Sequence, residues 1–212
     1  MSAAPQVLIV LLAGGQSRRM GGGDKCLRPL AGRPLLNHVI DSVAGQAAAV
    51  VLNANGDPAR FAAFPLPVVP DVLPGFAGPL AGVLTGLDWA AAHSPDLPWI
   101  VTVPTDAPFL PANLVAAMLA AVKAEQADMA TVASGGRRHP VVGLWPVGLR
   151  HALREALVEE GIRKVDVWTG RYRLAVAEFP AVPVDPFFNA NRPEDMEAAA
   201  ARIAPAEPPG PH

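Results

Sequence analysis

The chain has 212 residues, a length that fits one α/β domain with short appendages and excludes a large multidomain assembly. Hydrophobic residues make up 51% of it and charged residues only 17%, which supplies a sizeable core and excludes a disordered chain. The 17 lysines and arginines stand against 19 acidic residues, and the net charge of −2 excludes a global basic surface for nucleic acid.

Cysteine usage and hydropathy indicate a reducing, aqueous compartment. Cys26 is the single cysteine, so no intrachain disulfide forms, and no Cys/His cluster has the spacing of zinc ligands. The apolar run 7–13 is far shorter than the roughly 20 residues of a membrane span, and no lysine or arginine precedes it as in a signal peptide. We therefore predict a cytoplasmic protein that binds neither membrane nor nucleic acid.

Strands and helices are predicted to alternate along the first half of the chain. The branched apolar run 6–12 ends abruptly at Ala13 and a series of glycines, which is typical of a strand buried on both faces. A helix is predicted behind Pro34, because apolar residues follow at helical spacing as far as Val43. The further elements predicted in this half are a strand at 49–52, a short strand at 68–69, a helix at 80–92 and a strand at 99–103.

The second half continues the pattern and then changes composition. The elements predicted there are a helix from 112 to about 125, strands at 129–133 and 141–145, a helix at 149–159, a short helical piece around 165, a strand at 174–179 and a helix after Pro193. Strands that alternate with helices predict an α/β fold with a mostly parallel sheet and helices on both faces. We predict a single domain over 1–204 and a disordered proline-rich tail over 205–212.

A glycine-rich segment follows the first predicted strand. Between Leu12 and Lys25 it holds five glycines, two arginines and a lysine. Glycine lets backbone N–H groups approach a phosphate closely and fixed cations neutralise its charge, although a plain turn is the alternative. The segment is not a P-loop, because Lys25 is followed by Cys26 where serine or threonine is needed. It is not a dinucleotide-binding motif either, because Cys26 stands in place of the third glycine.

The same segment resembles a motif of nucleotidyltransferases that move a nucleoside monophosphate onto a phosphate acceptor. From Leu12 to Lys25 it reads L-A-G-G-x-S-x-R-M-G-x-x-D-K, which is most similar to the molybdenum cofactor guanylyltransferase family. Ala107 stands where many members carry threonine. Shorter matches extend over most of the chain, namely Asn53-Ala54-Asn55, Asp71, the run from Gly78 to Gly82, the run from Pro104 to Pro108, His139-Pro140, Phe188-Asn189-Ala190-Asn191 and Pro193-Glu194.

This resemblance implies a fold and a reaction. The fold is a Rossmann-like three-layer sandwich of the nucleotide-diphospho-sugar transferase type. The reaction transfers GMP from GTP to the terminal phosphate of molybdenum-bearing molybdopterin, which gives molybdopterin guanine dinucleotide and pyrophosphate. An in-line displacement at the α-phosphorus requires charge neutralisation and a metal more than a protein nucleophile. The protein partners implied are molybdenum-insertion proteins and recipient molybdoenzymes or their chaperones.

The resemblance also places catalytic groups. Arg19 and Lys25 suit the leaving pyrophosphate, with a solvated surface position as the alternative for Arg19. Asp106 follows a buried strand at its carboxyl edge, where open α/β sheets bind ligands, and its carboxylate suits Mg²⁺. A helix cap is the alternative for Asp106. Asp24 is expected to orient Lys25 or to act as a second metal contact, and the first role is favoured.

Contacts to GTP are expected from polar side chains and from the loop backbone. Asn53 and Asp71 each follow a predicted strand and resemble positions that contact the guanine nucleotide, although Asn53 also suits an ordinary turn. Guanine carries N1–H and N2–H donors that a carboxylate accepts, and adenine lacks both. The other expected contacts are the backbone N–H groups of Leu12, Ala13, Gly14 and Gly15.

The acceptor side is expected near the end of the chain. Asn189 and Asn191 resemble acceptor-side positions, and an Asx turn before the last helix is the alternative. His139, which follows two arginines, is a candidate for the pterin phosphate or an ordinary surface histidine.

Rival functions share the glycine-rich segment. A cytidylyltransferase that acts on the same pterin tends to carry a second alanine in the loop, so the glycine pair 14–15 favours guanine. A sugar-phosphate nucleotidyltransferase remains an alternative. A catalytically silent module predicts GTP binding without pyrophosphate release, and a dehydrogenase is disfavoured by the absent dinucleotide motif.

Overall fold

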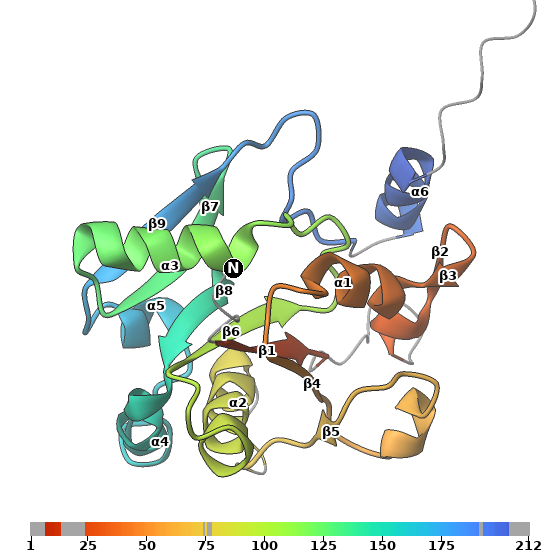
Figure 1. The fold of residues 1–212 in the computed structure, drawn as a ribbon. Helices are drawn as coiled ribbons and strands as arrows, with labels where there is room; N and C mark the ends of the chain where they lie inside the picture. The colour runs from red at the N-terminus through yellow and green to blue at the C-terminus, as the bar shows by residue number, and fades with distance from the viewer. Residues whose placement is uncertain (1–6, 14–23, 74, 76–77, 191–192, 204–212) are drawn as a thin grey trace, which may run out of the picture.

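The computed structural model describes residues 7–13, 24–73, 75, 78–190 and 193–203. Its main sheet consists of β1 (Val7–Leu12), β4 (Ala49–Asn53), β5 (Val68–Val69), β6 (Trp99–Pro104), β7 (Met129–Ser134), β8 (Arg137–Pro146) and β9 (Leu174–Phe179). The strand order of this seven-stranded sheet is β5-β4-β1-β6-β8-β7-β9 (Figure 1). The pairs β1–β4, β1–β6, β4–β5 and β7–β9 are parallel, and β8 runs antiparallel to β6 and β7. The sheet is therefore mostly parallel, as the sequence predicts.

Helices cover both faces of the sheet. One face carries α1 (Leu35–Val43) and α3 (Leu114–Glu125), and the other carries α2 (Pro79–His93), α4 (Arg150–Val158) and α5 (Val165–Thr169) (Figure 1). The predicted three-layer α/β sandwich is thereby confirmed. The helix bounds differ from the predicted ones by one or two residues, which is the usual scatter at helix ends.

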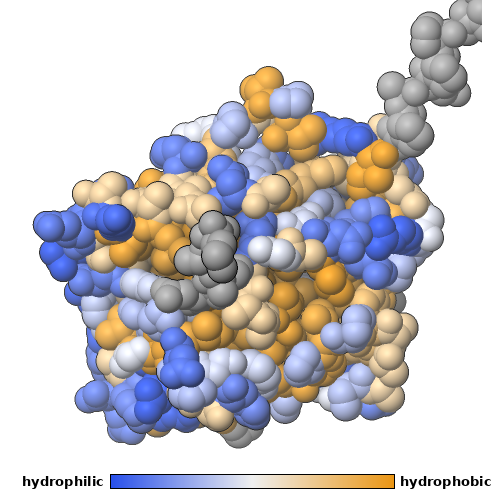
Figure 2. Space-filling view, viewed as in Figure 1, coloured by the Kyte–Doolittle hydropathy of each residue, from blue (hydrophilic) through white to orange (hydrophobic). Residues whose placement is uncertain are grey.

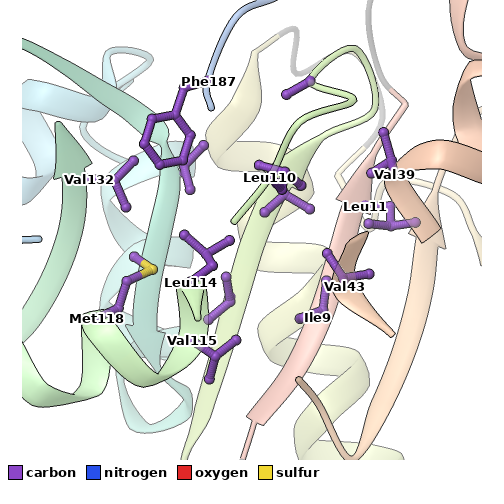
Figure 3. Packing of buried hydrophobic residues seen from close by; sticks show 14 of the residues in the cluster. Ile9, Leu11, Val39, Val43, Leu110, Leu114, Val115, Met118, Val132 and Phe187 are labelled. Carbon is purple, nitrogen blue, oxygen red and sulfur yellow. The ribbon is translucent and has the colours of Figure 1, made fainter. Parts of the chain in front are cut away.

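The sheet divides the apolar core into two halves, and β1 contributes side chains to both. Ile9 and Leu11 pack with α1 and α3, whereas Leu8 and Val10 pack with α2 and α4. All four side chains are fully buried, because successive residues of a strand point to opposite faces and both faces are covered here. Figure 3 shows the first half, with Ile9 and Leu11 facing side chains of α1 and the side chains of α3 lying farther along the same face. This burial explains why the run is continuously apolar rather than alternating.

A small hairpin of β2 (Pro29–Leu30) and β3 (Arg33–Pro34) was not among the predicted elements. Its two turn residues, Ala31 and Gly32, have φ values of 48° and 79°, as in the two-residue turns typical of hairpins. Strands of two residues are too short to show a periodic pattern. The hairpin packs Leu30 against Ala199 of α6 (Pro193–Ile203), so the last helix lies beside the start of the chain's first helix (Figure 1).

The surface is mixed in character. Hydrophilic side chains are spread over the outline of the molecule in Figure 2, with apolar side chains between them. Within the described ranges, no helix has both the length and the hydropathy needed to cross a membrane. The predicted tail 205–212 lies outside the described residues, and the domain boundary at 204 stays a prediction.

Candidate active site

Three strands end side by side at the carboxyl edge of the sheet. The register pairs Leu12 of β1 with Asn53 of β4 on one side and with Pro104 of β6 on the other. Thr105 then bonds back to the Leu12 carbonyl twice, through its N–H at 3.3 Å and its hydroxyl at 3.2 Å. These bonds fix the turn that carries Asp106 beside Leu12, at the end of β1. Ala107, the residue that departs from the family pattern, is buried in the core.

The structure brings two predicted catalytic residues together. Nζ of Lys25, in the short 3-10 helix η2 (Lys25–Leu27), donates to Oδ2 of Asp106 at 2.8 Å. The side chains of Lys25 and Asp106 are 15% and 24% exposed, so the pair is largely shielded from water. The other carboxylate oxygen of Asp106, Oδ1, is buried and has no hydrogen-bond partner among the described residues. A buried carboxylate oxygen without a partner is costly, so Oδ1 is suited to accept a cation.

The surroundings of Asp106 fit a divalent metal that is held jointly with a substrate. Within the described parts of the chain, no group of three or more His, Cys, Asp or Glu side chains is arranged to hold a metal ion. Mg²⁺ commonly binds through one or two carboxylates together with substrate phosphates and water. A lone carboxylate oxygen at this edge matches that mode of binding.

Cys26 follows Lys25 but takes no part in this polar group. Its side chain is 3% exposed and packs in the same half of the core as Ile9. Burial raises the pKa of the thiol to about 11, and the charge of Asp24 acts in the same direction, while the interaction with Thr105 acts in the opposite one. The thiol therefore stays protonated near neutral pH, which is unsuited to a nucleophile.

Asp24 has a different partner from the one expected. Its Oδ2 accepts from Nε of Arg60, in the 3-10 helix η3 (Pro58–Phe61), whereas the carboxylate that holds Lys25 belongs to Asp106. Arg60 also donates to the backbone carbonyls of Asn55 and Asp57. This arginine ties the end of the glycine-rich segment to the loop after β4. Sequence reasoning missed it, because a single arginine in a polar loop carries no signal.

Asn53 and Asp71, which the sequence analysis expects at the guanine nucleotide, lie in contact with each other. Nδ2 of Asn53 donates to Oδ1 of Asp71 at 2.9 Å and to the Val69 carbonyl at 3.1 Å, which uses both of its hydrogens. Asn55 donates to Oδ2 of Asp71 at 2.8 Å and accepts from the Asp71 N–H at 2.8 Å. Asn53 is only 3% exposed. The two asparagines therefore orient Asp71, whose carboxylate oxygens retain further acceptor capacity.

Helix α2 approaches Asn53 closely. A Cβ atom on Gly82 would lie 2.5 Å from Asn53 Oδ1 and 2.6 Å from Leu12 Cδ2, so a larger residue there would displace these side chains. The helix begins at Pro79, one residue before the predicted start, behind Gly78, whose φ of 134° favours glycine. The amino-terminal turn of α2 thus lies beside the carboxyl edge of the sheet.

One of the backbone N–H groups predicted to contact GTP makes a hydrogen bond within the protein instead. The N–H of Ala13 donates to the Asn53 carbonyl at 2.9 Å, so it is not directed at a ligand in this structure. The other predicted residues of this segment, Gly14, Gly15 and Arg19, lie outside the described residues.

The segment that carries Asn189, which the sequence analysis expects on the acceptor side, packs against the turn that carries Asp106. The N–H of Ala190 donates to the backbone carbonyl of Asp106 at 3.0 Å, and the Phe188 ring contacts Phe109 with centroids 6.5 Å apart. Asn189 is exposed between these contacts. The structure therefore brings Asn189 near Asp106 from 83 positions away in the chain, whereas Asn191 lies outside the described residues.

His139 faces the base of that segment rather than open solvent. Its Nε2 lies 2.8 Å from the Ser134 hydroxyl, and its ring lies 4.9 Å from that of Phe187. Burial lowers the pKa of His139, and Arg137 acts in the same direction while Asp185 opposes it. Sequence reasoning missed Ser134 and Asp185, because a serine in a strand and an aspartate before proline are ordinary structural residues.

Comparison with known proteins agrees with this geometry. Residues 9–172 match the family model described as "MobA-like NTP transferase domain". A protein named "Molybdenum cofactor guanylyltransferase" from Bradyrhizobium sp. (strain ORS 278) is 60% identical over 198 residues, which is 93% of each chain. A protein of the same name from Shewanella sp. (strain MR-4) is 41% identical over 93% of this chain and 97% of its own.

A solved structure supports the fold. The molybdopterin-guanine dinucleotide biosynthesis protein A from Archaeoglobus fulgidus superposes with a TM-score of 0.70 at 20% identity, and the match covers 92% of this chain and 97% of that chain. The motif from Leu12 to Lys25, the pair of Lys25 with Asp106 and the similarity over nearly the whole length agree. The chain belongs to the MobA-like NTP transferase domain family and, within it, to the molybdenum cofactor guanylyltransferases.

Proposed function

We propose that this chain transfers GMP from GTP to the terminal phosphate of molybdopterin. An oxygen of the acceptor phosphate forms a bond to the α-phosphorus of GTP, the bond from that phosphorus to the bridging oxygen of the β-phosphate breaks, and pyrophosphate leaves. The products are molybdopterin guanine dinucleotide and pyrophosphate. Family membership supports the reaction, and the pair of Lys25 with Asp106 at the carboxyl edge of the sheet is the structural observation that carries it.

Asp106 is the residue we assign to Mg²⁺. Its Oδ1 is buried without a partner among the described residues, while its Oδ2 is held by Lys25. The ion, when bound there with the triphosphate, supplies positive charge to the phosphate oxygens. The lysine and the turn fixed by Thr105 hold the carboxylate in place for that role.

Lys25 and Arg19 are assigned to the charge that develops on the leaving pyrophosphate. The ammonium of Lys25 is largely buried, where a fixed cation interacts with a phosphate more strongly than in water. Arg19 belongs to the same glycine-rich motif. No protein nucleophile is required, and the raised pKa of Cys26 agrees with this.

Asp71 is assigned to the guanine base. With Asn53 and Asn55 donating to its two oxygens, the carboxylate is oriented and still able to accept from N1–H and N2–H. Asn53 holds Asp71 in place, and the backbone N–H groups of Gly14 and Gly15 are assigned to further contacts with GTP, whereas the Ala13 N–H is bonded to the Asn53 carbonyl. Adenine lacks both donors, and leaving buried polar groups unpaired costs roughly 1–3 kcal/mol each, so discrimination on the order of a hundredfold follows.

Asn189 and Asn191 are assigned to the acceptor phosphate. The bond from Ala190 to the Asp106 carbonyl supports this assignment, because it holds the segment against the metal-binding turn. Molybdenum-insertion proteins and recipient molybdoenzymes or their chaperones would then supply the acceptor and receive the product.

Pyrophosphate release tests the proposal. Purified protein is given molybdopterin with GTP, CTP or ATP in the presence of Mg²⁺, and kcat/KM is measured for each nucleotide in competition. We expect GTP to exceed the other two by about a hundredfold. Equal use of CTP and GTP would remove the guanylyl assignment but leave nucleotidyl transfer, and GTP binding without pyrophosphate release would leave only a nucleotide-binding module.

A further inference from the structure

A buried polar group that the proposed mechanism leaves unused lies at the base of the acceptor-side segment. Ser134, the last residue of β7, is 2% exposed. Its hydroxyl lies 2.7 Å from Oδ1 of Asp185 and 2.8 Å from Nε2 of His139. We call these three residues the Ser134 cluster. It joins the β7–β8 pair to the chain that follows β9, since His139 lies in β8 and Asp185 opens the segment 185–190.

The directions of its hydrogen bonds follow from proton counting. The serine hydroxyl has one proton, and an ionised carboxylate only accepts. Ser134 therefore donates to Asp185, and its oxygen accepts from the Nε2–H of His139. Both bonds form with a neutral imidazole, and burial of His139, which lowers its pKa, favours that form. The charged groups that face the ring are Asp185 and Arg137, and they act on it in opposite directions.

Asp185 also holds the backbone of the segment 185–190 through hydrogen bonds. Its Oδ1 also accepts from the Phe187 N–H at 2.9 Å, and its backbone carbonyl accepts from the Phe188 N–H at 3.1 Å. The Phe187 ring is 2% exposed and contacts the rings of His139 and Phe179 at 4.9 and 5.4 Å. The first residues of the segment are thus fixed by one side chain and one buried ring.

The far end of the segment is fixed by the active site itself. Ala190 donates to the backbone carbonyl of Asp106 at 3.0 Å. Asn189 therefore lies on a short stretch of backbone that is held by Asp185 at one end and by the Asp106 turn at the other. A displacement at the Asp185 end changes where Asn189 and the Asp106 backbone lie.

We propose that the Ser134 cluster positions the segment 185–190, and with it Asn189 and the Asp106 turn, for the acceptor phosphate. Ser134, His139 and Asp185 act through the segment and are positioning residues. The identity of the acceptor rests on the proposed function, whereas the coupling of the segment to the cluster rests on the hydrogen bonds alone.

Variants of Asp185 test the role through a split in kinetic constants. Asp185→Ala removes the acceptor for both Ser134 and Phe187, and we expect the KM for molybdopterin to rise about tenfold and kcat to fall about tenfold. The Kd for GTP measured without Mg²⁺ should change less than about twofold, because the bonds of Asn53 and Asn55 to Asp71 are not altered. Asp185→Asn keeps an oxygen in place of Oδ1, so it should behave like the wild type within about threefold.

Asp128→Ala is the matched control. Oδ2 of Asp128 accepts from the Arg173 N–H at 2.9 Å, which is the same kind of bond, at the opposite ends of β7 and β9. This variant should leave the KM for molybdopterin and the KM for GTP unchanged. Ser134→Ala provides a second disruption of the cluster, without altering Asp185, if the Asp185→Ala protein does not fold.

Hydrogen exchange supplies a readout that needs no acceptor. In Asp185→Ala or Ser134→Ala, the amides of Phe187 and Ala190 should exchange about tenfold faster than in the wild type, and in Asp128→Ala at the wild-type rate. If the wild-type protein shows no transfer activity but the variants show this exchange pattern, the proposed function is removed and the positioning role is still supported. The positioning is overturned by unchanged exchange and KM in the disrupted variants, by an equal loss of GTP affinity, or by Asp185→Asn behaving like Asp185→Ala.

Discussion

At the residue scale, the site depends on polar atoms whose bonding capacity the fold leaves incomplete. Asp106 gives one oxygen to Lys25 and keeps the other buried, while Asp71 accepts one bond on each oxygen and has room for more. Asn53, in contrast, donates both amide hydrogens to acceptors within the protein. Ligand binding is expected at the first two groups, and support of a neighbour at the third.

Replacing Asp106 should stop transfer without unfolding the protein. Asp106→Ala removes the carboxylate assigned to the metal, so we expect pyrophosphate release to fall about a thousandfold or more. The side chain is 24% exposed and is not part of the apolar core, so the melting profile should show a folded protein. Turnover like that of the wild type at saturating Mg²⁺ would remove the metal assignment.

Lys25→Ala should weaken GTP binding and slow transfer together. The ammonium is assigned to phosphates in both the ground state and the transition state, so we expect about tenfold or more in Kd and a similar loss in kcat. Arg33→Ala is a control, because its pair with Asp41 lies in the nearby hairpin region but is more than half exposed. Titration that shows unchanged GTP affinity and rate in Lys25→Ala would exclude this lysine from the phosphate site.

Cys26 should be slow to alkylate in the folded protein. A pKa raised from 9.0 to about 11 lowers the thiolate fraction about a hundredfold at pH 8, and burial hinders access as well. The folded state holds the thiol proton more tightly, so the stability it contributes is present below about pH 9 and is lost as the pH rises toward 11. Reaction with iodoacetamide, compared in buffer and in denaturant, measures the difference. Equal rates in the two would contradict the burial of this thiol.

At the element scale, the close approach of α2 to the strand ends determines where Asn53 lies. Gly82 meets Asn53 and Leu12, and one turn further along the same helix Gly86 meets Val10 and Ile100. Both glycines allow the helix to lie tightly on the sheet, but only Gly82 borders a residue of the site. Substitutions at these two positions therefore distinguish an effect on helix packing from an effect on the site.

Gly82→Ala and Gly86→Ala should have similar effects on stability but different effects on GTP. In each, a Cβ would lie 2.5 Å from a neighbouring side chain, and overpacking of this kind costs about 1–3 kcal/mol of unfolding free energy. Only Gly82→Ala pushes on Asn53 and through it on Asp71, so only this variant should lose GTP affinity when measured on fully folded protein. Gly148→Ala is a neutral control, since no atom lies within 4 Å of its Cβ position. Equal GTP affinity in the variants at 82 and 86 would contradict the supporting role of Asn53.

At the scale of the whole molecule, stability and metal binding are separate properties. The core consists of two apolar halves on either side of the sheet, and the described residues provide no cage of three or more metal-binding side chains. The fold therefore rests on hydrophobic burial, and the proposed Mg²⁺ is expected to bind together with the substrate.

Chelation should abolish activity without lowering the melting temperature. With EDTA in excess and no nucleotide present, we expect the midpoint of thermal unfolding to stay within about 1 °C of its value without chelator, because the described residues form no group of three or more side chains that could hold a metal ion. Pyrophosphate release should stop and return when Mg²⁺ is restored. A fall of several degrees would indicate a structural metal site instead.

The sequence by itself determined the architecture and most of the residue types at the site. Continuous apolar runs such as 7–12 define strands buried on both faces, and their alternation with amphipathic segments defines a three-layer fold, because periodicity is a local property of the chain. The glycine-rich motif from Leu12 to Lys25 likewise indicated nucleotide chemistry, through resemblance and through the proximity of glycines and cations.

Only the tertiary structure decided which of these residues act together. Lys25 meets Asp106 across 81 positions, Arg60 meets Asp24 across 36, and Ser134 meets Asp185 across 51. No local pattern encodes such pairs, since they depend on strand order, on register and on the path of the loops at the carboxyl edge. Asp24 was expected to pair with Lys25 but pairs with Arg60, and the Ser134 cluster was not predicted. Hydrogen-bond partners depend on which residues the fold brings together, whereas a periodic pattern reports only on residues that are close in the sequence.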